Sequence, residues 1–397
     1  MSSICEDILA NGVITITGEC KGCDACVKQC PTGAITVNGL GTKHAIDPEK
    51  CVNCGRCLVA CPFGRIQDVS MVEDVKAAIA AGKTVVVQPA PAVRVALAEA
   101  FGAEVGTNAE GKMFSALREL GFTVVYDTLF SADLTIMEEG YELLGRIFKS
   151  LGLPGYENAG VLPQFTSCCP GWVRYAELFH PEILPNLSTA KSPMMMLGAL
   201  IKTYGAKNLG VNPADVYSVA IMPCTAKKFE ASRPEFISSG YQDVDAVITT
   251  RELAEMIAEA GIDFASLPEG EVDKLLGTGS GAGVIFGATG GVMEAALRTA
   301  YAVVSGEELA VLEIDAVRGE GALREATITI PLNADLKAAT GAESVDVKVA
   351  IVSGVENVEP VIEQINAGTC DYHFIEVMNC PGGCINGGGQ PIEHSIF

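Results

Sequence analysis

Most of the chain after about residue 76 alternates short apolar runs with amphipathic stretches of helical periodicity. Five apolar runs are predicted to be buried strands, and each precedes a predicted helix. The predicted strands are residues 83–90, 122–130, 216–224, 245–250 and 347–354, and the predicted helices are 92–102, 132–152, 225–232, 251–261 and 356–368. Repeated strand–helix alternation predicts parallel βαβ units and therefore an α/β domain.

Cysteines follow one of these runs and two further short apolar segments. "LPQF" leads into "TSCCP", "VAIM" leads into "PC", and "HFIEVM" leads into "NCPGGC". Functional sites of parallel sheets form beyond the carboxyl ends of the strands. The pattern therefore predicts that these cysteine loops carry the chemistry of the domain.

Composition limits the possible functions. The formal net charge of −22 argues against nucleic acid, which demands Lys and Arg for its phosphates. The first 20 residues lack a basic segment followed by an apolar one, and no apolar run reaches the length of a membrane span. We therefore expect a soluble, cytoplasmic protein. In a reducing compartment its fifteen cysteines indicate metal ligands or catalytic thiols rather than disulfides.

Nine of the fifteen cysteines lie in residues 1–61, where "CKGCDACVKQCP" recurs as "CVNCGRCLVACP". In two-cluster ferredoxins the fourth cysteine of each such repeat ligates the other cluster. The spacing therefore predicts two [4Fe–4S] clusters. One has the ligands Cys20, Cys23, Cys26 and Cys61, and the other has Cys51, Cys54, Cys57 and Cys30. A pair of structural zinc sites is the alternative, which two complete repeats ending in Pro disfavour.

Five further cysteines stand in the three loops after the predicted strands: Cys168, Cys169, Cys224, Cys380 and Cys384. Four thiolates suffice for one more [4Fe–4S] cluster, which leaves one thiol over. The glycines at 382–383 and 387–389 allow close approach of backbone to a bulky group. From spacing alone, a buried structural cluster with spare cysteines remains an alternative. Cys5 and Cys370 fit no motif and are interpreted as structural.

The three loops together resemble the signature motifs of the [FeFe]-hydrogenases, in the same order. "TSCCPGW", "MPCTAKKFE" and "EVMNCPGGCINGGGQP" carry the resemblance, which extends over nearly the whole chain and includes the ferredoxin-like repeat. It implies a small α+β ferredoxin-like domain at 1–75. It also implies an α/β hydrogenase domain at 76–397, with the H-cluster between two lobes.

The resemblance implies a specific cofactor and ligand set. The H-cluster is a [4Fe–4S] cubane joined by one cysteine to a two-iron unit with CO, cyanide and azadithiolate ligands. By motif match, Cys169, Cys224 and Cys380 ligate the cubane, and Cys384 bridges it to the two-iron unit. Cys168 is not a ligand in the family and passes protons. The two adjacent cysteines are therefore expected to serve the electron path and the proton path respectively.

A proton relay is also implied by the resemblance. It runs from Cys168 through Glu139, Ser188 and Glu142, with Arg146 expected near the surface. Glu139 and Glu142 are three residues apart and so share one face of a helix. A carrier works best with a pKa near ambient pH, and burial raises the pKa of a carboxyl group. An ordinary acidic helix face is the alternative.

Further residues match family positions around the two-iron unit. Lys227 resembles the lysine that donates to a cyanide ligand, with a solvated lysine at a helix start as the alternative. Pocket-lining residues are expected to be Ala90, Pro91, Met222, Phe286 and Met378. Asn379 departs from the family, in which Ala is usual before the third cubane ligand.

The implied activity is reversible interconversion of H₂ with protons and electrons, exchanged with ferredoxin or a c-type cytochrome. Maturation proteins would install the two-iron unit. The sequence ends seven residues after Gln390, where many relatives continue, so a small second subunit that supplies the missing helical wrap is a possible partner. An export signal on that partner would make the location periplasmic instead of cytoplasmic.

Three other classes are weighed against this interpretation. Hydrogenase-like iron–sulfur assembly factors keep cubane cysteines without a complete two-iron pocket. H₂ sensors tend to lose the proton-passing cysteine and gain a signalling domain. An NAD-linked oxidoreductase needs a nucleotide site, and the run "GTGSGAG" lacks the strand–GxGxxG–helix context for one.

Overall fold

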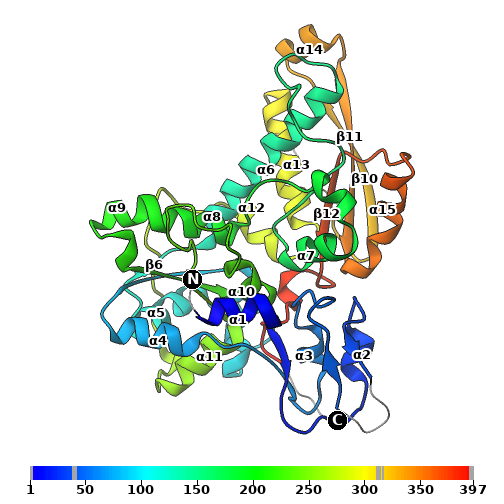
Figure 1. The fold of residues 1–397 in the computed structure, drawn as a ribbon. Helices are drawn as coiled ribbons and strands as arrows, with labels where there is room; N and C mark the ends of the chain where they lie inside the picture. The colour runs from blue at the N-terminus through cyan, green and yellow to red at the C-terminus, as the bar shows by residue number, and fades with distance from the viewer. Residues whose placement is uncertain (1–2, 38–42, 310–313, 315–316, 393–397) are drawn as a thin grey trace. The chain divides into compact units, whose positions relative to one another are not determined.

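The structure is a computed structural model that describes residues 3–37, 43–309, 314 and 317–392 (Figure 1). The chain divides into two compact units, each made of several segments. Unit 1 contains residues 1–131, 193–280 and 384–397, and unit 2 contains residues 132–192 and 281–383. The predicted domain boundary after residue 75 rests on the cysteine motifs, whereas these units are defined by how compactly the chain packs. The boundary therefore stays a prediction.

The amino-terminal part of unit 1 is a small α+β arrangement in which each cysteine repeat contains one short helix. Its elements are α1 (Ser3–Asn11), β1 (Ile14–Ile16), α2 (Ala25–Gln29), β2 (Ile35–Thr36), β3 (Ala45–Ile46), α3 (Arg56–Ala60) and β4 (Ile66–Asp68). β1 pairs with β4 and β2 with β3, both antiparallel. Asp24 before α2 and Gly55 before α3 both have positive φ, so the two cysteine repeats share one local conformation.

A four-stranded parallel sheet in the order β6-β5-β8-β9 forms the centre of unit 1. Its strands are β5 (Thr84–Pro89), β6 (Val124–Val125), β8 (Val216–Met222) and β9 (Ala246–Thr249). The helices of this part are α4 (Val72–Ala80), α5 (Glu110–Glu119), α8 (Pro193–Leu200), α9 (Ala206–Leu209), α10 (Ala226–Ala231) and α11 (Thr250–Glu259). The parallel βαβ prediction is confirmed here.

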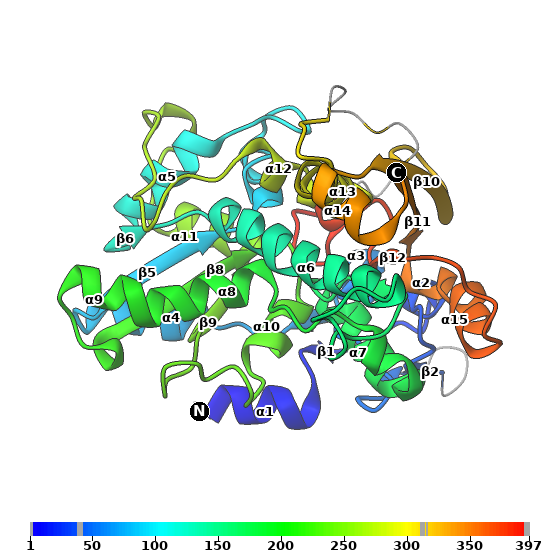
Figure 2. The same cartoon turned by 90° about the horizontal axis from the view of Figure 1, so that it is seen from above.

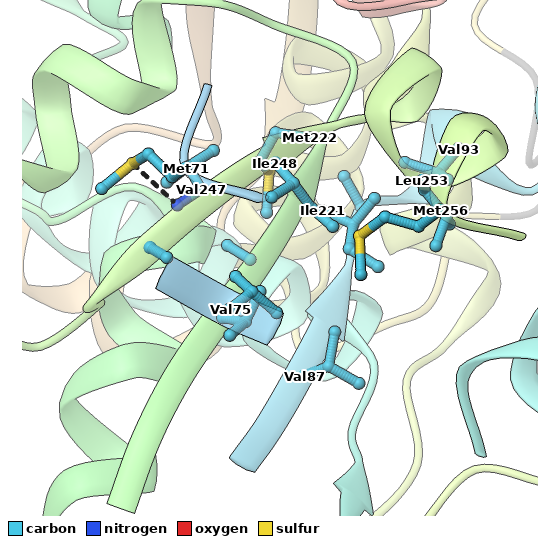
Figure 3. Close-up of a cluster of buried hydrophobic side chains, with 14 of the residues drawn as sticks. Met71, Val75, Val87, Val93, Ile221, Met222, Val247, Ile248, Leu253 and Met256 are labelled. Atoms are coloured by element: carbon cyan, nitrogen blue, oxygen red, sulfur yellow. Dashed lines mark hydrogen bonds between the residues drawn. The ribbon is translucent and has the colours of Figure 1, made fainter. Parts of the chain in front are cut away.

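Alternation along β5 assigns helices to the two faces of this sheet. Val85 and Val87 belong to the core that includes α4, α5 and α11, whereas Val86 packs with α8 and the turn after it (Figure 2). Figure 3 shows the first core, where Val87 lies near side chains of β8, β9 and α11 and the backbone N–H of Val247 donates to Met71 Sδ at 3.4 Å. The sheet is buried on both faces, as its nearly continuous apolar strands require.

Unit 2 contains a mixed sheet in the order β10-β11-β12-β7. Its strands are β7 (Gln164–Phe165), β10 (Leu323–Pro331), β11 (Ser344–Ser353) and β12 (Phe374–Met378), and its helices are α7 (Pro170–Phe179), α12 (Gly281–Val284), α13 (Gly291–Ser305), α14 (Ala334–Thr340) and α15 (Glu359–Asn366). Helix α6 (Thr128–Ser150) begins in unit 1 and continues into unit 2. β11, β12 and β7 are parallel, but the β10–β11 pair is antiparallel.

The prediction of a regular helix at 92–102 is wrong. The segment forms two 3₁₀ helices, η1 (Pro91–Val93) and η2 (Leu97–Phe101). Buried Arg94 explains the break, because its Nε donates to the Pro91 carbonyl at 3.1 Å while its own carbonyl accepts from the N–H of Ala109 at 2.8 Å. Both carbonyls are thereby taken from the hydrogen bonds of an α-helix.

Buried charges connect the ferredoxin-like part to the parallel sheet. Lys228 in α10 is fully buried and donates to Asp68 at the end of β4 at 2.6 Å and to both carboxylate oxygens of Glu252 at 2.8–2.9 Å. Glu252 also completes the capping box of α11 with Thr249. The lysine therefore compensates two carboxylates that come from different parts of unit 1.

We predict that Lys228→Met lowers the free energy of unfolding by about 3–5 kcal/mol, because it leaves Glu252 buried without its cation and leaves Asp68 with the longer Arg251 contact of 3.3 Å. Denaturant unfolding of the cluster-loaded chain measures this. Lys76→Met is the matched control, because Lys76 bridges Glu73 and Glu259 at an exposed position, where ion pairs contribute little. Equal losses in the two variants would contradict the prediction.

Candidate active site

The first predicted set of ferredoxin-type cysteines lines one cavity in unit 1: Cys20, Cys23, Cys26 and Cys61. Burial raises the pKa of the Cys26 thiol, and the nearby thiols of Cys23 and Cys61 raise it further. Within the described residues, no group of three His, Cys, Asp or Glu side chains is arranged to hold a single metal ion. Four thiols around one cavity suit a polynuclear cluster, which would also supply the positive charge that thiolates need.

The second predicted set also comes together. Burial raises the pKa of Cys57 well above its ordinary value, and the neighbouring thiols of Cys54, Cys51 and Cys30 contribute to the increase. Cys30 and Cys26 of the first sequence repeat both contribute to the raised pKa of Cys57, so the exchange of fourth ligands between repeats stays a prediction.

The loop that carries Cys54 contacts the loop that carries Cys224. Thr225 Oγ1 donates to the carbonyl oxygen of Asn53 at 2.7 Å. A Cβ on Gly388 would lie 2.3 Å from the carbonyl oxygen of Cys54, so only glycine permits this approach. The backbone beside the second ferredoxin-type group therefore contacts the Thr225 side chain of one hydrogenase-like motif and the Gly388 backbone of another.

Cys224 and Cys384 lie in adjacent loops of unit 1. The N–H of Gly389 donates to the carbonyl of Pro223 at 2.8 Å, and a Cβ on Gly387 would lie 2.1 Å from that same oxygen. The glycines of the "GGGQ" run serve backbone-to-backbone packing that holds these two cysteine loops together.

Cys169 and Cys380 lie in adjacent loops of unit 2. β7 ends at Phe165 and β12 at Met378, and the two strands are parallel neighbours in the sheet. Cys169 is the N-cap of α7, and the first turn of that helix contacts Asn379, whose Cγ would be 3.1 Å from a Cβ on Gly171. Each unit thus contains two of these cysteines in contacting loops.

The predicted relay carboxyls form a hydrogen-bonded chain in unit 2. The N–H of Ser167, one residue before Cys168, donates to Glu139 Oε1 at 3.2 Å. Ser188 lies close enough to the Glu139 carboxyl to lower its pKa, and its hydroxyl donates to Glu142 Oε2 at 2.7 Å. Cys168 itself is partly buried. The relay members Glu139, Ser188 and Glu142 are therefore brought together.

Burial raises the pKa of the Glu139 carboxyl to about 8. The group therefore keeps its proton at neutral pH. The Ser188 hydroxyl donates to Glu142 and also lowers the pKa of Glu139, which partly offsets the effect of burial. The Glu142 side chain is 19% exposed.

The expectation that Arg146 lies near the surface is wrong, because only 2% of the residue is exposed. Its guanidinium donates to Glu142 Oε1 at 2.6 Å and to the carbonyls of Val161, Asn186 and Leu187. Three carbonyls fix the arginine in place. Arg146 therefore positions Glu142, and the outermost relay group with solvent access is Glu142 itself.

Lys227 is neither solvated nor at an exposed helix start. Its side chain is 12% exposed and its Nζ forms an ion pair with Glu230 at 2.7 Å. Of the predicted pocket residues, Ala90 and Met222 lie at the ends of adjacent strands β5 and β8 in unit 1, next to Pro91. Phe286 and Met378 are buried in unit 2. The lining role of these five residues stays a prediction.

Sequence reasoning missed Glu376, which is fully buried in β12. Burial raises the pKa of its carboxyl to about 7, and it accepts from the N–H groups of Gly290 and Met293 at 2.6 and 2.7 Å. The carboxyl holds the amino-terminal turn of α13 next to the segment that carries Phe286. The available signal was an acidic residue inside the otherwise apolar run "HFIEVM".

Comparison with known proteins identifies the family. A family model described as the iron-only hydrogenase large subunit, C-terminal domain, matches residues 83–388, and a 4Fe-4S dicluster domain model matches residues 19–65. The chain therefore belongs to the iron-only hydrogenase family.

Three individual similarities illustrate the range of relatives. The periplasmic [Fe] hydrogenase large subunit of Nitratidesulfovibrio vulgaris is 50% identical over 382 residues, which cover 96% of this chain and 86% of that protein. A variant of the apo [FeFe]-hydrogenase HydA1 from Chlamydomonas reinhardtii matches with a TM-score of 0.71 and 43% identity over 81% of this chain and 85% of that one. The cytosolic Fe-S cluster assembly factor narfl of Xenopus tropicalis is 34% identical, covering 78% of this chain and 62% of that protein.

We predict that Glu139 is protonated at pH 6 to 7 and ionises near pH 8. Infrared difference spectra should show a carboxylic acid C=O band that fades as the pH rises through about 8 and that is absent in Glu139→Gln. Because burial disfavours the charged form, the band should persist far above the pH at which an exposed Glu ionises. A band lost near pH 4 to 5, the ordinary range for Glu, would contradict the assignment.

Proposed function

We propose that the chain catalyses the reversible interconversion of H₂ with two protons and two electrons. The observation that carries this proposal is the chain of Glu139, Ser188 and Glu142, anchored through Ser167 beside the Cys168–Cys169 pair. A protein that only stores a cluster has no use for a buried, protonated carboxyl connected to a more exposed one. Membership of the iron-only hydrogenase family supports the same conclusion.

The cofactors are two [4Fe–4S] clusters and an H-cluster. Cys20, Cys23, Cys26 and Cys61 hold one cluster, and Cys30, Cys51, Cys54 and Cys57 hold the other. Cys169, Cys224, Cys380 and Cys384 hold the cubane of the H-cluster, with Cys384 also joined to the two-iron unit. The grouping of the thiols, and the glycine-dependent contacts of the loops that carry them, fit this donor set. When bound, the H-cluster supplies the redox-active metal at which the H–H bond is made or broken.

The protein side chains hold and move the proton. Cys168 has a thiol that no motif requires as a ligand, so it exchanges a proton with the reacting centre. Glu139 holds the next proton at its carboxyl oxygen and passes it to Ser188 Oγ, which simultaneously gives its own proton to Glu142 Oε2. Arg146 orients Glu142 as the acceptor through an ion pair at 2.6 Å.

Electrons travel through the ferredoxin-like part. The contact of Asn53 and Cys54 with Thr225 and Gly388 supports the cluster of Cys30, Cys51, Cys54 and Cys57 as the inner one. The cluster of Cys20, Cys23, Cys26 and Cys61 then receives electrons from outside. Ferredoxin or a c-type cytochrome is the carrier we expect.

The alternative is a non-catalytic assembly factor, a class represented among the relatives. A cluster scaffold needs the cubane cysteines but neither the additional cysteine Cys168 nor a proton chain behind it. The buried Glu139–Ser188–Glu142 connection therefore favours the enzyme.

The proposed partners of the chain and its location in the cell rest on the family resemblance. Maturation proteins would install the two-iron unit, and a small second subunit would supply a helical wrap. The relative named as a periplasmic large subunit fits a periplasmic location reached with such a subunit, and the cytoplasm remains the other possibility. Every helix in the described part of the chain is too short or too polar to cross a lipid bilayer.

We predict that Cys168→Ala retains the iron content of the wild type but lowers H₂ production from reduced viologen by about 10²–10⁴-fold, the usual contribution of a positioned proton donor. Cys370→Ala is the matched control, because Cys370 is a partly buried thiol outside every motif. Both chains are loaded with the two-iron complex before assay.

Loss of iron in Cys168→Ala would contradict the division of roles between the paired cysteines. Full turnover in that variant would contradict the proton-transfer role of the thiol. Wild-type protein that makes no H₂ above an unloaded control would overturn the enzyme assignment itself.

A further inference from the structure

We propose that Asn379 donates an N–H···S hydrogen bond to the Cys380 thiolate and thereby raises the reduction potential of the cubane that Cys380 ligates. The inference deepens the proposed function, because it rests on Cys380 being a cubane ligand. Asn379 would be a positioning and tuning residue that acts through the sulfur of its neighbour.

The contact is enclosed and specific. Asn379 is 2% exposed, and its Nδ2 lies 3.9 Å from the Sγ of Cys380, within reach of a hydrogen bond to sulfur. In the described part of the chain, Oδ1 of the same amide is buried without a hydrogen-bond partner. A buried amide that leaves its oxygen unsatisfied incurs a desolvation cost. The donor end offsets that cost most effectively when the sulfur is a charged thiolate, since charge-assisted bonds are shorter and stronger.

The backbone holds the amide in place. Asn379 directly follows β12, and the N–H of Gly354 fixes the preceding carbonyl of Met378 at 2.8 Å. On its other side the amide packs on Gly171 in the first turn of α7, where an added Cβ would lie 3.1 Å from Asn379 Cγ and 3.2 Å from its Cβ. Gly171 thus leaves the space that the larger side chain occupies.

The direction of the effect follows from charge. Reduction adds one electron to the cluster and increases the negative charge on its ligand sulfurs. A hydrogen-bond donor aimed at a ligand sulfur therefore stabilises the reduced state more than the oxidised state, and such bonds are among the factors that set cluster potentials. Burial strengthens the interaction, because water does not screen it.

The test is a redox titration of the full chain carrying only its [4Fe–4S] clusters, followed by electron paramagnetic resonance. We expect Asn379→Ala and Asn379→Leu to lower the midpoint reduction potential of the cubane. The expected shift corresponds to an equilibrium constant for reduction that is about tenfold smaller, which is 59 mV for one electron. Leu keeps the volume of the side chain without its N–H. The two ferredoxin-type clusters should titrate unchanged and serve as internal references.

Asn186→Ala is the matched control, because Asn186 is also a buried asparagine of unit 2 but donates to the carbonyl of Pro163 at 2.8 Å. An unmoved cubane potential in both Asn379 variants would overturn the proposal, as would an equal shift in Asn186→Ala. If no third cluster signal exists in the wild type, the failure lies with the ligand assignment and hence with the proposed function.

A second measurement needs no variant. In wild-type protein labelled with ¹⁵N-asparagine, pulsed electron paramagnetic resonance of the reduced cubane should detect a ¹⁵N coupling. Absence of that coupling would overturn the hydrogen bond even if the variants failed to assemble their clusters.

Discussion

An iron–sulfur cubane requires four thiolates at one point, and this requirement explains much of the architecture. Parallel strands present their carboxyl ends at one edge of a sheet, so the loops that follow them meet there. In unit 2 this places the loops of Cys169 and Cys380 side by side after β7 and β12. In unit 1 the loop of Cys224 leaves β8 and is held to the Cys384 loop by contacts that only glycine allows. Within each unit, two of the cysteine loops are thus held next to each other.

The proton path depends on a different physical effect, the cost of burying a carboxylate. Glu139 lies where water does not reach, so it holds its proton at neutral pH. Glu142 differs because Arg146 donates to it and its side chain is partly exposed. The two glutamates have the same side chain but different surroundings, and Ser188 donates to Glu142. A donor and an acceptor are thus created from two identical residue types by environment alone.

Much of this arrangement could be predicted from the sequence because its signals are local. The cysteine spacings predicted both ferredoxin-type groups, and the apolar runs located β5, β8, β9 and β11. Features set by distant contacts were not predictable in the same way. The burial of Arg146 depends on carbonyls 15 and 40–41 residues further along the chain, and the interruption of residues 92–102 depends on Arg94, whose partners include Asp127. The ligand roles and the domain boundary remain predictions.

The most direct test of the account is the number of cubanes that the full chain holds when it is produced without its maturation proteins, measured by iron content and Mössbauer spectroscopy. The account predicts three [4Fe–4S] clusters in the wild type and two in Cys380→Ala, with both ferredoxin-type clusters retained. Three clusters in that variant, or only two in the wild type, would contradict it.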